Sequence, residues 1–108
     1  MNYPVKVSFF ILFSMFLMSG CMREEPVKVG FLIHALDKER WENDMNFFIE
    51  KVNEFGGTVE VRIAENDMTK QLKQADELLN LGMNVLVIVP VDQFAASQIV
   101  KNAHVKNV

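Results

Sequence analysis

Two adjacent side chains, Arg40 and Trp41, have the chemistry to hold a small polar ring. An indole covers the apolar C–H face of such a ring, and a guanidinium donates several hydrogen bonds in fixed directions to hydroxyl groups on its rim. Two other interpretations stay open. Trp41 begins an apolar helical stripe and could belong to the core, and Arg40 could be a solvated residue at a helix start. A cation near a helix amino end is disfavoured without a partner, which favours a functional role for Arg40.

Polar residues nearby are weaker candidates for the same site. His34 stands where the first expected strand leaves the sheet and could face the site, although a lone histidine there is more often a hydrogen-bonded loop residue. Asp37 and Asp92 could accept hydrogen bonds from hydroxyl groups, but capping a helix is the commoner task and the one we expect for Asp92. His104 lies near the end of an expected surface helix and needs no function.

The sequence gives little support for catalysis. No glycine-rich phosphate-binding loop follows the first expected strand, because Gly30 stands alone there. His34 and His104 are 70 positions apart with no cysteine between them, which does not match metal-ligand spacing. We therefore expect no enzyme activity, no metal and no cofactor.

Alternating strand and helix patterns position these side chains. The expected strands are residues 27–33, 59–64 and 85–89. The apolar stripe of the first expected helix is Trp41, Met45, Phe48, Ile49, Val52 and Phe55. The stripe of the second is Met68, Leu72, Ala75 and Leu79, and that of the third is Phe94, Ala95, Ile99 and Ala103. Gly56 and Gly82 are placed to end the first two helices, and Asn66-Asp67 and Asp92 to cap the last two.

This alternation predicts an α/β fold of βαβαβα order with a parallel sheet and right-handed crossovers. Strand 85–89 is the most hydrophobic and is expected to be central, whereas the alternating pattern of strand 59–64 indicates a peripheral position. Residues 106–108 resemble the approach to a fourth strand. In such sheets ligands bind beyond the carboxyl ends of the strands, which directs the search to residues 34–40, 65–69 and 90–93.

A short apolar run precedes Cys21, the only cysteine. About a dozen apolar residues are too few to span a ~30 Å hydrocarbon core comfortably, so the run is typical of an export signal. The small residues Ser19 and Gly20 before Cys21 resemble a bacterial lipobox, with Met18 where leucine is commonest. We expect residues 1–20 to be a lipoprotein signal peptide, residues 21–26 a linker after a lipidated Cys21, and residues 27–108 one folded unit. The alternative is a buried thiol in an uncleaved membrane helix.

The charge balance argues against nucleic acid as a partner. All 14 acidic residues but only 10 of the 11 basic ones follow Gly20, which gives that part a formal charge of −4 (10 − 14). No basic stripe, repeat or low-complexity tract is present. The expected location is therefore extracytoplasmic, with the chain held to a membrane by lipid.

Residues 27–33, the Glu39-Arg40-Trp41 triplet that opens the first helix, and the spacing to residues 82–90 resemble the periplasmic sugar-binding protein family. Within it the similarity is greatest to the D-xylose-binding proteins, through that triplet and the helix register after it. The resemblance spans residues 27–108 and implies the amino-terminal lobe of a type I periplasmic-binding-protein fold, cut short. It also implies that Arg40 and Trp41 line a sugar cleft, whereas the resembled xylose binders tend to have an acidic residue at the place of His34.

Three functions follow from this resemblance. The favoured one is a lipid-anchored sugar-binding component of an ABC-type importer, present as an amino-terminal fragment, with a pentose such as D-xylose as ligand and an ABC permease as partner. The second is a sugar-sensing lipoprotein that docks on a membrane receptor such as a histidine kinase. The third is a remnant that binds nothing, since a small domain without a second lobe buries only a modest core and half of a cleft.

Overall fold

A computed structural model describes residue 20 and residues 23–108 as a three-stranded parallel sheet with three helices. The strands are β1 (Lys28–Ile33), β2 (Thr58–Ile63) and β3 (Val85–Val89). The helices are α2 (Glu39–Glu54), α3 (Met68–Asn80) and α4 (Gln93–Val105). Each strand is followed by a helix, so the α/β class and the βαβαβα order predicted from the sequence are confirmed.

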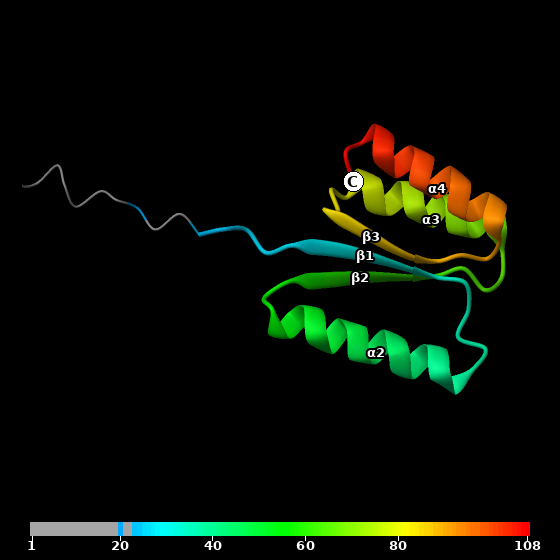
Figure 1. The fold of residues 1–108 in the computed structure, drawn as a ribbon, viewed down its shortest axis with the longest axis horizontal. Coiled ribbons are helices and arrows are strands. Elements are labelled where there is room, and N and C mark those ends of the chain that lie inside the picture. The colour runs from blue at the N-terminus through cyan, green and yellow to red at the C-terminus, as the bar shows by residue number, and fades with distance from the viewer. Residues whose placement is uncertain (1–19, 21–22) are drawn as a thin grey trace, which may run out of the picture.

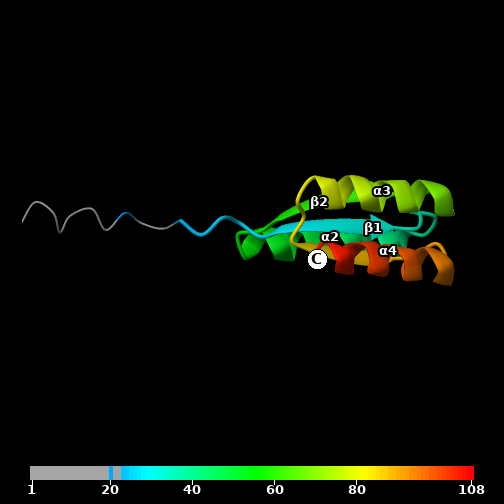
Figure 2. The ribbon, with the colours of Figure 1, turned by 90° about the horizontal axis from the view of Figure 1, so that it is seen from above.

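The strand order is β2-β1-β3, with β1 in the centre (Figure 1). The step from β1 to β2 and the step from β2 to β3 run in opposite directions across the sheet. Right-handed crossovers therefore place α2 and α3 on opposite faces, as Figure 2 shows. Helix α4 lies beside α3, on the side away from β2 (Figure 1).

The prediction that the third strand is central is wrong. β3 borders the sheet of the described residues and is only half-buried, whereas all of β1 after Lys28 is buried. The hydrophobicity of a strand indicates how completely its side chains are covered on the two faces of the sheet. The position of that strand in the sheet is set instead by the direction of the crossovers. The expectation that β2 is peripheral is confirmed.

Successive residues of β1 serve the two faces of the sheet in turn. Leu32 faces the main core with Ala75, Leu78, Met83 and Ile99. Phe31 points to the other face, where its ring lies 5.1 Å from that of Phe48 in α2. Helix α2 has no fully buried residue, so its face of the sheet is the more thinly covered one.

The inner face of α4 is narrower than predicted. Ala95, Ile99 and Ala103 are buried, as expected, but Phe94 is exposed. The three buried residues follow one another at intervals of four and form one stripe. Phe94 precedes Ala95 by one position, about 100° around the helix, and so turns toward solvent.

The predicted helix ends are confirmed. The carboxylates of Asp67 and Asp92 accept hydrogen bonds from the backbone N–H groups of Lys70 and Ala95, at 3.0 and 2.7 Å. Gly56 and Gly82 have φ angles of 83° and 78°, in the region that favours glycine. After α4 the chain turns at residues 106–107, so the expected approach to a fourth strand ends without a strand among the described residues.

The predicted signal peptide and Cys21 lie outside the described residues, apart from Gly20. Residues 23–26 of the predicted linker are exposed and lead directly into β1 (Figure 1). In the part of the chain that the structure covers, no helix combines the length and the apolar character needed to cross a bilayer.

Candidate functional site

The carboxyl ends of the three strands meet at one edge of the sheet, which we call the carboxyl edge. It consists of residues 34–41 after β1, residues 64–67 after β2 and residues 90–92 after β3. Backbone hydrogen bonds fix the first two segments to each other: Ala64 N–H donates to the Ile33 carbonyl at 3.0 Å, and Asn66 N–H donates to the His34 carbonyl at 2.8 Å. The edge is the place where ligands bind in open parallel sheets.

Three of the predicted site residues form a contact chain at this edge. The rings of His34 and Trp41 meet edge to face, with centroids 5.0 Å apart and planes at 87°. The Arg40 guanidinium lies 5.4 Å from the centroid of the Trp41 ring, within cation–π range. The structure therefore brings an aromatic ring, a cation and an imidazole together at this edge.

Asp37 joins this group through His34. Its carboxylate oxygen lies 3.8 Å from His34 Nε2, and half of the carboxylate side chain is exposed. The other ring nitrogen, His34 Nδ1, is buried and has no hydrogen-bond partner in the structure. His34 is thus not a fully hydrogen-bonded loop histidine, the commoner alternative considered from the sequence.

The positions of Arg40 and Trp41 are compatible with more than one of the alternatives considered from the sequence. Trp41 is half-buried, so it is neither a fully buried core residue nor a fully exposed one. Arg40 is 77% exposed and has an acidic neighbour, because its Nε donates to an Asp44 carboxylate oxygen at 3.4 Å, one helical turn away. That pair is weak at such exposure, so the guanidinium is free to turn toward a ligand. Their role in sugar binding stays a prediction.

Two glutamines that the sequence analysis missed build the frame of this edge. The buried Gln71 side chain donates from Nε2 to the Val89 carbonyl at 3.1 Å, and its Oε1 accepts from Val91 N–H at 2.8 Å. Gln74 donates to the Ile63 carbonyl at 2.9 Å. They close the ends of β3 and β2 from α3. Both glutamines belong to the buried face of α3, which includes Leu78 and is rotated from the predicted stripe, so that stripe gave no signal for them.

The other two candidates from the sequence, Asp92 and His104, do not place a free side chain at the carboxyl edge. Asp92 caps α4, as expected, and its carboxylate oxygen is occupied by Ala95 N–H. His104 lies exposed in the last turn of α4, far along that helix from the carboxyl edge. Glu65 and Asn66 have positive φ angles of 54° and 60°, a strained backbone at the carboxyl edge of a kind that gathers at ligand sites.

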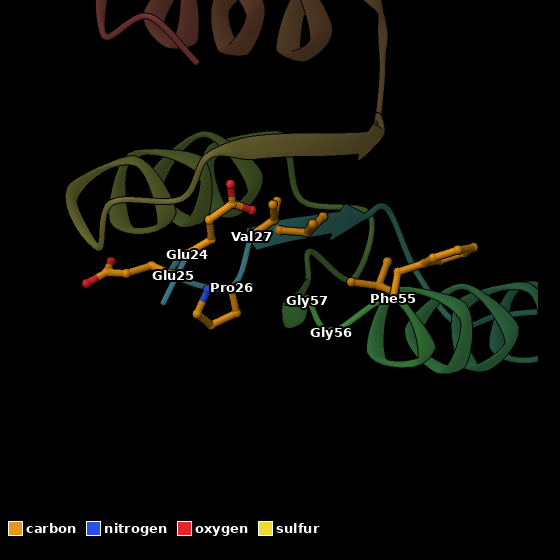
Figure 3. A pocket seen from close by; sticks show the side chains of 9 residues that line it. Glu24, Glu25, Pro26, Val27, Phe55, Gly56 and Gly57 are labelled. Carbon is orange, nitrogen blue, oxygen red and sulfur yellow. The ribbon is translucent and has the colours of Figure 1, made fainter. Parts of the chain in front are cut away.

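A hollow of the described surface lies at the opposite end of the sheet. Figure 3 shows it between residues 24–27 and the turn after α2, with Phe55, Gly56 and Gly57 along its side. Its volume is about 410 Å³. Because it is at the amino ends of the strands, it is separate from the carboxyl edge.

Solved structures share this fold. A carbohydrate transporter solute-binding protein from Chloroflexus aurantiacus in complex with D-glucose has a TM-score of 0.70 and 27% identity; the match covers 79% of this chain and 25% of that one. An ABC transporter solute-binding protein from Mycobacterium smegmatis with bound glycerol has a TM-score of 0.72 and 24% identity, over 76% and 28%. The fold is that of ABC-transporter solute-binding proteins.

Two relatives found by sequence are D-xylose-binding periplasmic proteins. The chain is 33% identical over 90 residues to the D-xylose-binding periplasmic protein of Escherichia coli, which is 83% of this chain and 27% of that protein. It is 31% identical over 85 residues to the protein of the same name from Haemophilus influenzae, 79% of this chain and 26% of that protein. The resemblance to periplasmic sugar-binding proteins is confirmed, and the chain spans about a quarter of the length of these relatives. No family model matches the chain.

Proposed function

We propose that this chain supplies one wall of the sugar site of a solute-binding protein that delivers a pentose, D-xylose in the first instance, to an ABC-type importer. The observation that carries the proposal is the group of Arg40, Trp41 and His34 at the carboxyl edge of a sheet whose sequence relatives are D-xylose-binding periplasmic proteins. Neither those relatives nor the structural neighbours are named as enzymes, so a binding role is favoured over a catalytic one.

The geometry explains how such a wall would work. The half-buried indole of Trp41 offers its ring to the C–H face of a sugar, and the exposed guanidinium of Arg40 offers several donors to the hydroxyl groups beside it. The His34 ring meets the Trp41 ring edge to face and adds a second polar ring beside the indole. Asp37 adds an exposed acceptor at the rim of the same group.

The proposed location is outside the cytoplasm, with a lipid on Cys21 as the membrane attachment. The support is the apolar run with a small-residue approach to the only cysteine, together with relatives that are periplasmic. The folded unit begins within a few residues of Cys21, as expected of a linker that only lifts the domain off the lipid.

The test is a chimera in which this chain replaces the matched 90-residue segment of the Escherichia coli D-xylose-binding protein, with sugar affinity measured by isothermal titration calorimetry. We expect the chimera to bind D-xylose. Trp41→Ala should weaken binding by about tenfold or more, since stacking of this kind is worth roughly 1.5 kcal/mol. Phe47→Ala is the matched control, because Phe47 is an exposed aromatic on the same helix that has no contact with Trp41 in the structure.

Two results would contradict the proposal at different levels. A chimera that folds, by circular dichroism, but binds none of D-xylose, D-ribose and D-glucose would reject sugar binding by this chain. A chimera that binds sugar with Trp41→Ala within twofold of the unsubstituted affinity would reject the cleft role of Trp41 and favour its core role.

A further inference from the structure

Strand β2 borders the sheet of the described residues, and we call the side of β2 that faces away from β1 its outer side (Figure 1). Ala64 N–H, directly after β2, donates to the Ile33 carbonyl of β1 at 3.0 Å. The carbonyl of the same planar trans peptide unit, that of Ile63, therefore points away from β1. Backbone groups of a strand alternate in direction from residue to residue. Three residues of β2 thus direct their N–H and C=O groups to the outer side: Val59, Val61 and Ile63.

Side chains from two different elements occupy two of these three outward carbonyls. Gln74 reaches from α3 and donates from Nε2 to the Ile63 carbonyl at 2.9 Å. Arg62, in β2 itself, donates from Nη1 to the Val61 carbonyl at 2.9 Å. A strand added on the outer side would place its own N–H groups on the same carbonyls. Such a strand would therefore have to displace both side chains first.

Further contacts hold both side chains in place. The Arg62 guanidinium lies 3.2 Å from a Glu60 carboxylate oxygen and 3.9 Å from one of Glu77 in α3. The side chain of Arg62 is 27% exposed, and Gln74 is only 9% exposed. Displacing them would break these ion pairs and move a buried amide, so the outer side of β2 resists an incoming strand.

The packing of the core does not explain why a glutamine stands at position 74. Its Oε1 is buried without a hydrogen-bond partner in the described structure, and a buried acceptor of this kind lowers stability. A leucine would fill the same buried position on α3 without that cost. The bond from Nε2 to the Ile63 carbonyl is the contact that glutamine makes and leucine cannot make.

The sequence of β2 is suited to pairing with a copy of itself. Residues 59–63 read Val-Glu-Val-Arg-Ile, and β-branched residues of this kind favour strands. In an antiparallel register centred on Val61, Glu60 of one copy stands opposite Arg62 of the other. Val59 stands opposite Ile63 in the same register. Opposite charges and β-branched side chains that face each other stabilise cross-strand pairs, so an unblocked β2 would select a second copy of this chain.

We infer that Arg62 and Gln74 block the outer side of β2 and thereby keep the β2 segment of a second copy of this chain from adding to the sheet. The two donors act on neighbouring outward carbonyls, one from the strand and one from α3. The inference requires neither a lipid on Cys21 nor a sugar at the carboxyl edge. It therefore stands or falls apart from the proposed function.

A synthetic, fluorescently labelled peptide of residues 57–64 tests the block as a substitute for the second copy. It is titrated against the full 108-residue chain in a non-ionic detergent, and fluorescence anisotropy measures its binding. We expect Arg62→Ser with Gln74→Leu to bind the peptide about tenfold or more tightly than the native chain, since each freed carbonyl can accept one hydrogen bond. Lys73→Ser with Gln98→Leu is the matched control. It makes the same kinds of change at side chains that do not bond β2 in the described structure.

Hydrogen exchange measured by NMR shows where the peptide binds. Strand addition should protect the outward N–H groups of Val59, Val61 and Ile63 in the double variant and leave them unprotected in the native chain and in the control. Tighter binding without this protection would place the peptide elsewhere and would overturn the inference.

The inference is also overturned if the double variant, folded by circular dichroism, binds the peptide no better than the native chain, or if the control pair gains as much affinity. If the double variant unfolds, Gln74→Leu alone decides the question. It frees only the Ile63 carbonyl, so part of the gain in affinity and protection of the Ile63 N–H are expected. No gain in that variant would reject the block.

Discussion

Gln71 is the residue on which the carboxyl edge depends most directly. It is fully buried, and both ends of its amide are bonded to the backbone that follows β3. The segment it holds leads to Asp92, the cap of α4. One side chain thus couples the end of a strand to the start of the next helix at the candidate site.

We expect Gln71→Leu to lower the free energy of unfolding by about 2 kcal/mol, because the half-buried Val89 carbonyl and Val91 N–H each lose a partner. Gln74→Leu is the control on the same helix face. It removes one hydrogen bond and also an Oε1 that has no partner, so the loss should be smaller. Urea unfolding followed by circular dichroism measures both, and an equal loss for the two variants would contradict the assigned role of Gln71.

At the scale of the elements, Gly30 in β1 marks a close approach of side chains from β3 and α3. Gly30 has no side chain, and a Cβ there would lie 2.7 Å from Leu86 Cδ2 and 2.9 Å from Leu78 Cδ1. These are the ends of flexible side chains in β3 and α3. Gly30 therefore lets β3 and α3 close over the central strand.

Gly30→Ala is expected to cost about 2 kcal/mol through overpacking, and Leu86→Val should recover part of that loss by removing the atom in the way. A double-mutant cycle by urea unfolding measures the coupling. Gly82→Ala is the control: it has open space but a φ of 78°, so its cost is conformational and Leu86→Val should not reduce it. Purely additive effects of Gly30→Ala and Leu86→Val would show that the contact is not tight.

At the scale of the whole molecule, the two ends of the sheet have different chemistry. The carboxyl edge gathers an indole, a guanidinium and an imidazole, whereas the opposite end of the sheet has the hollow beside residues 24–27. The described chain enters at that opposite end, through the exposed residues 23–26 (Figure 1). A sugar site at one end and the proposed lipid attachment at the other are therefore compatible in one small unit.

Cys21→Ser tests the attachment on this scale. We expect the native chain, expressed from its full 108-residue sequence, to fractionate with membranes and to carry the mass of a lipid on a product that begins at Cys21. The variant should lose that mass and keep residues 1–20, because the small cysteine thiol that accepts the lipid is gone. Cell fractionation and intact-mass spectrometry check both; an identical mass change in the two proteins would reject lipidation at Cys21.

Much of the fold was predictable from local pattern. The helix caps at Asp67 and Asp92 and the glycines that end two helices depend on residues close in the chain, and they were recovered. The apolar stripes were recovered only in part, because Phe55, placed on the inner stripe of the first helix, is 90% exposed. Phe94 was misplaced because the register of a helix face shifts by about 100° with one residue. Gln71 and Gln74 were missed because their partners lie at the ends of strands 18 and 11 positions away.

The sequence by itself determined the order of elements and the residues that follow the carboxyl end of each strand, where the sugar site is proposed, because these follow from periodicity and from the uniform hand of crossovers. Only the tertiary structure decided that β1 rather than β3 is central, that the rings of His34 and Trp41 meet edge to face, and that Gln71 bonds the backbone at the end of β3. Each of these depends on groups distant in sequence coming together, and their packing is decided by the folded chain as a whole.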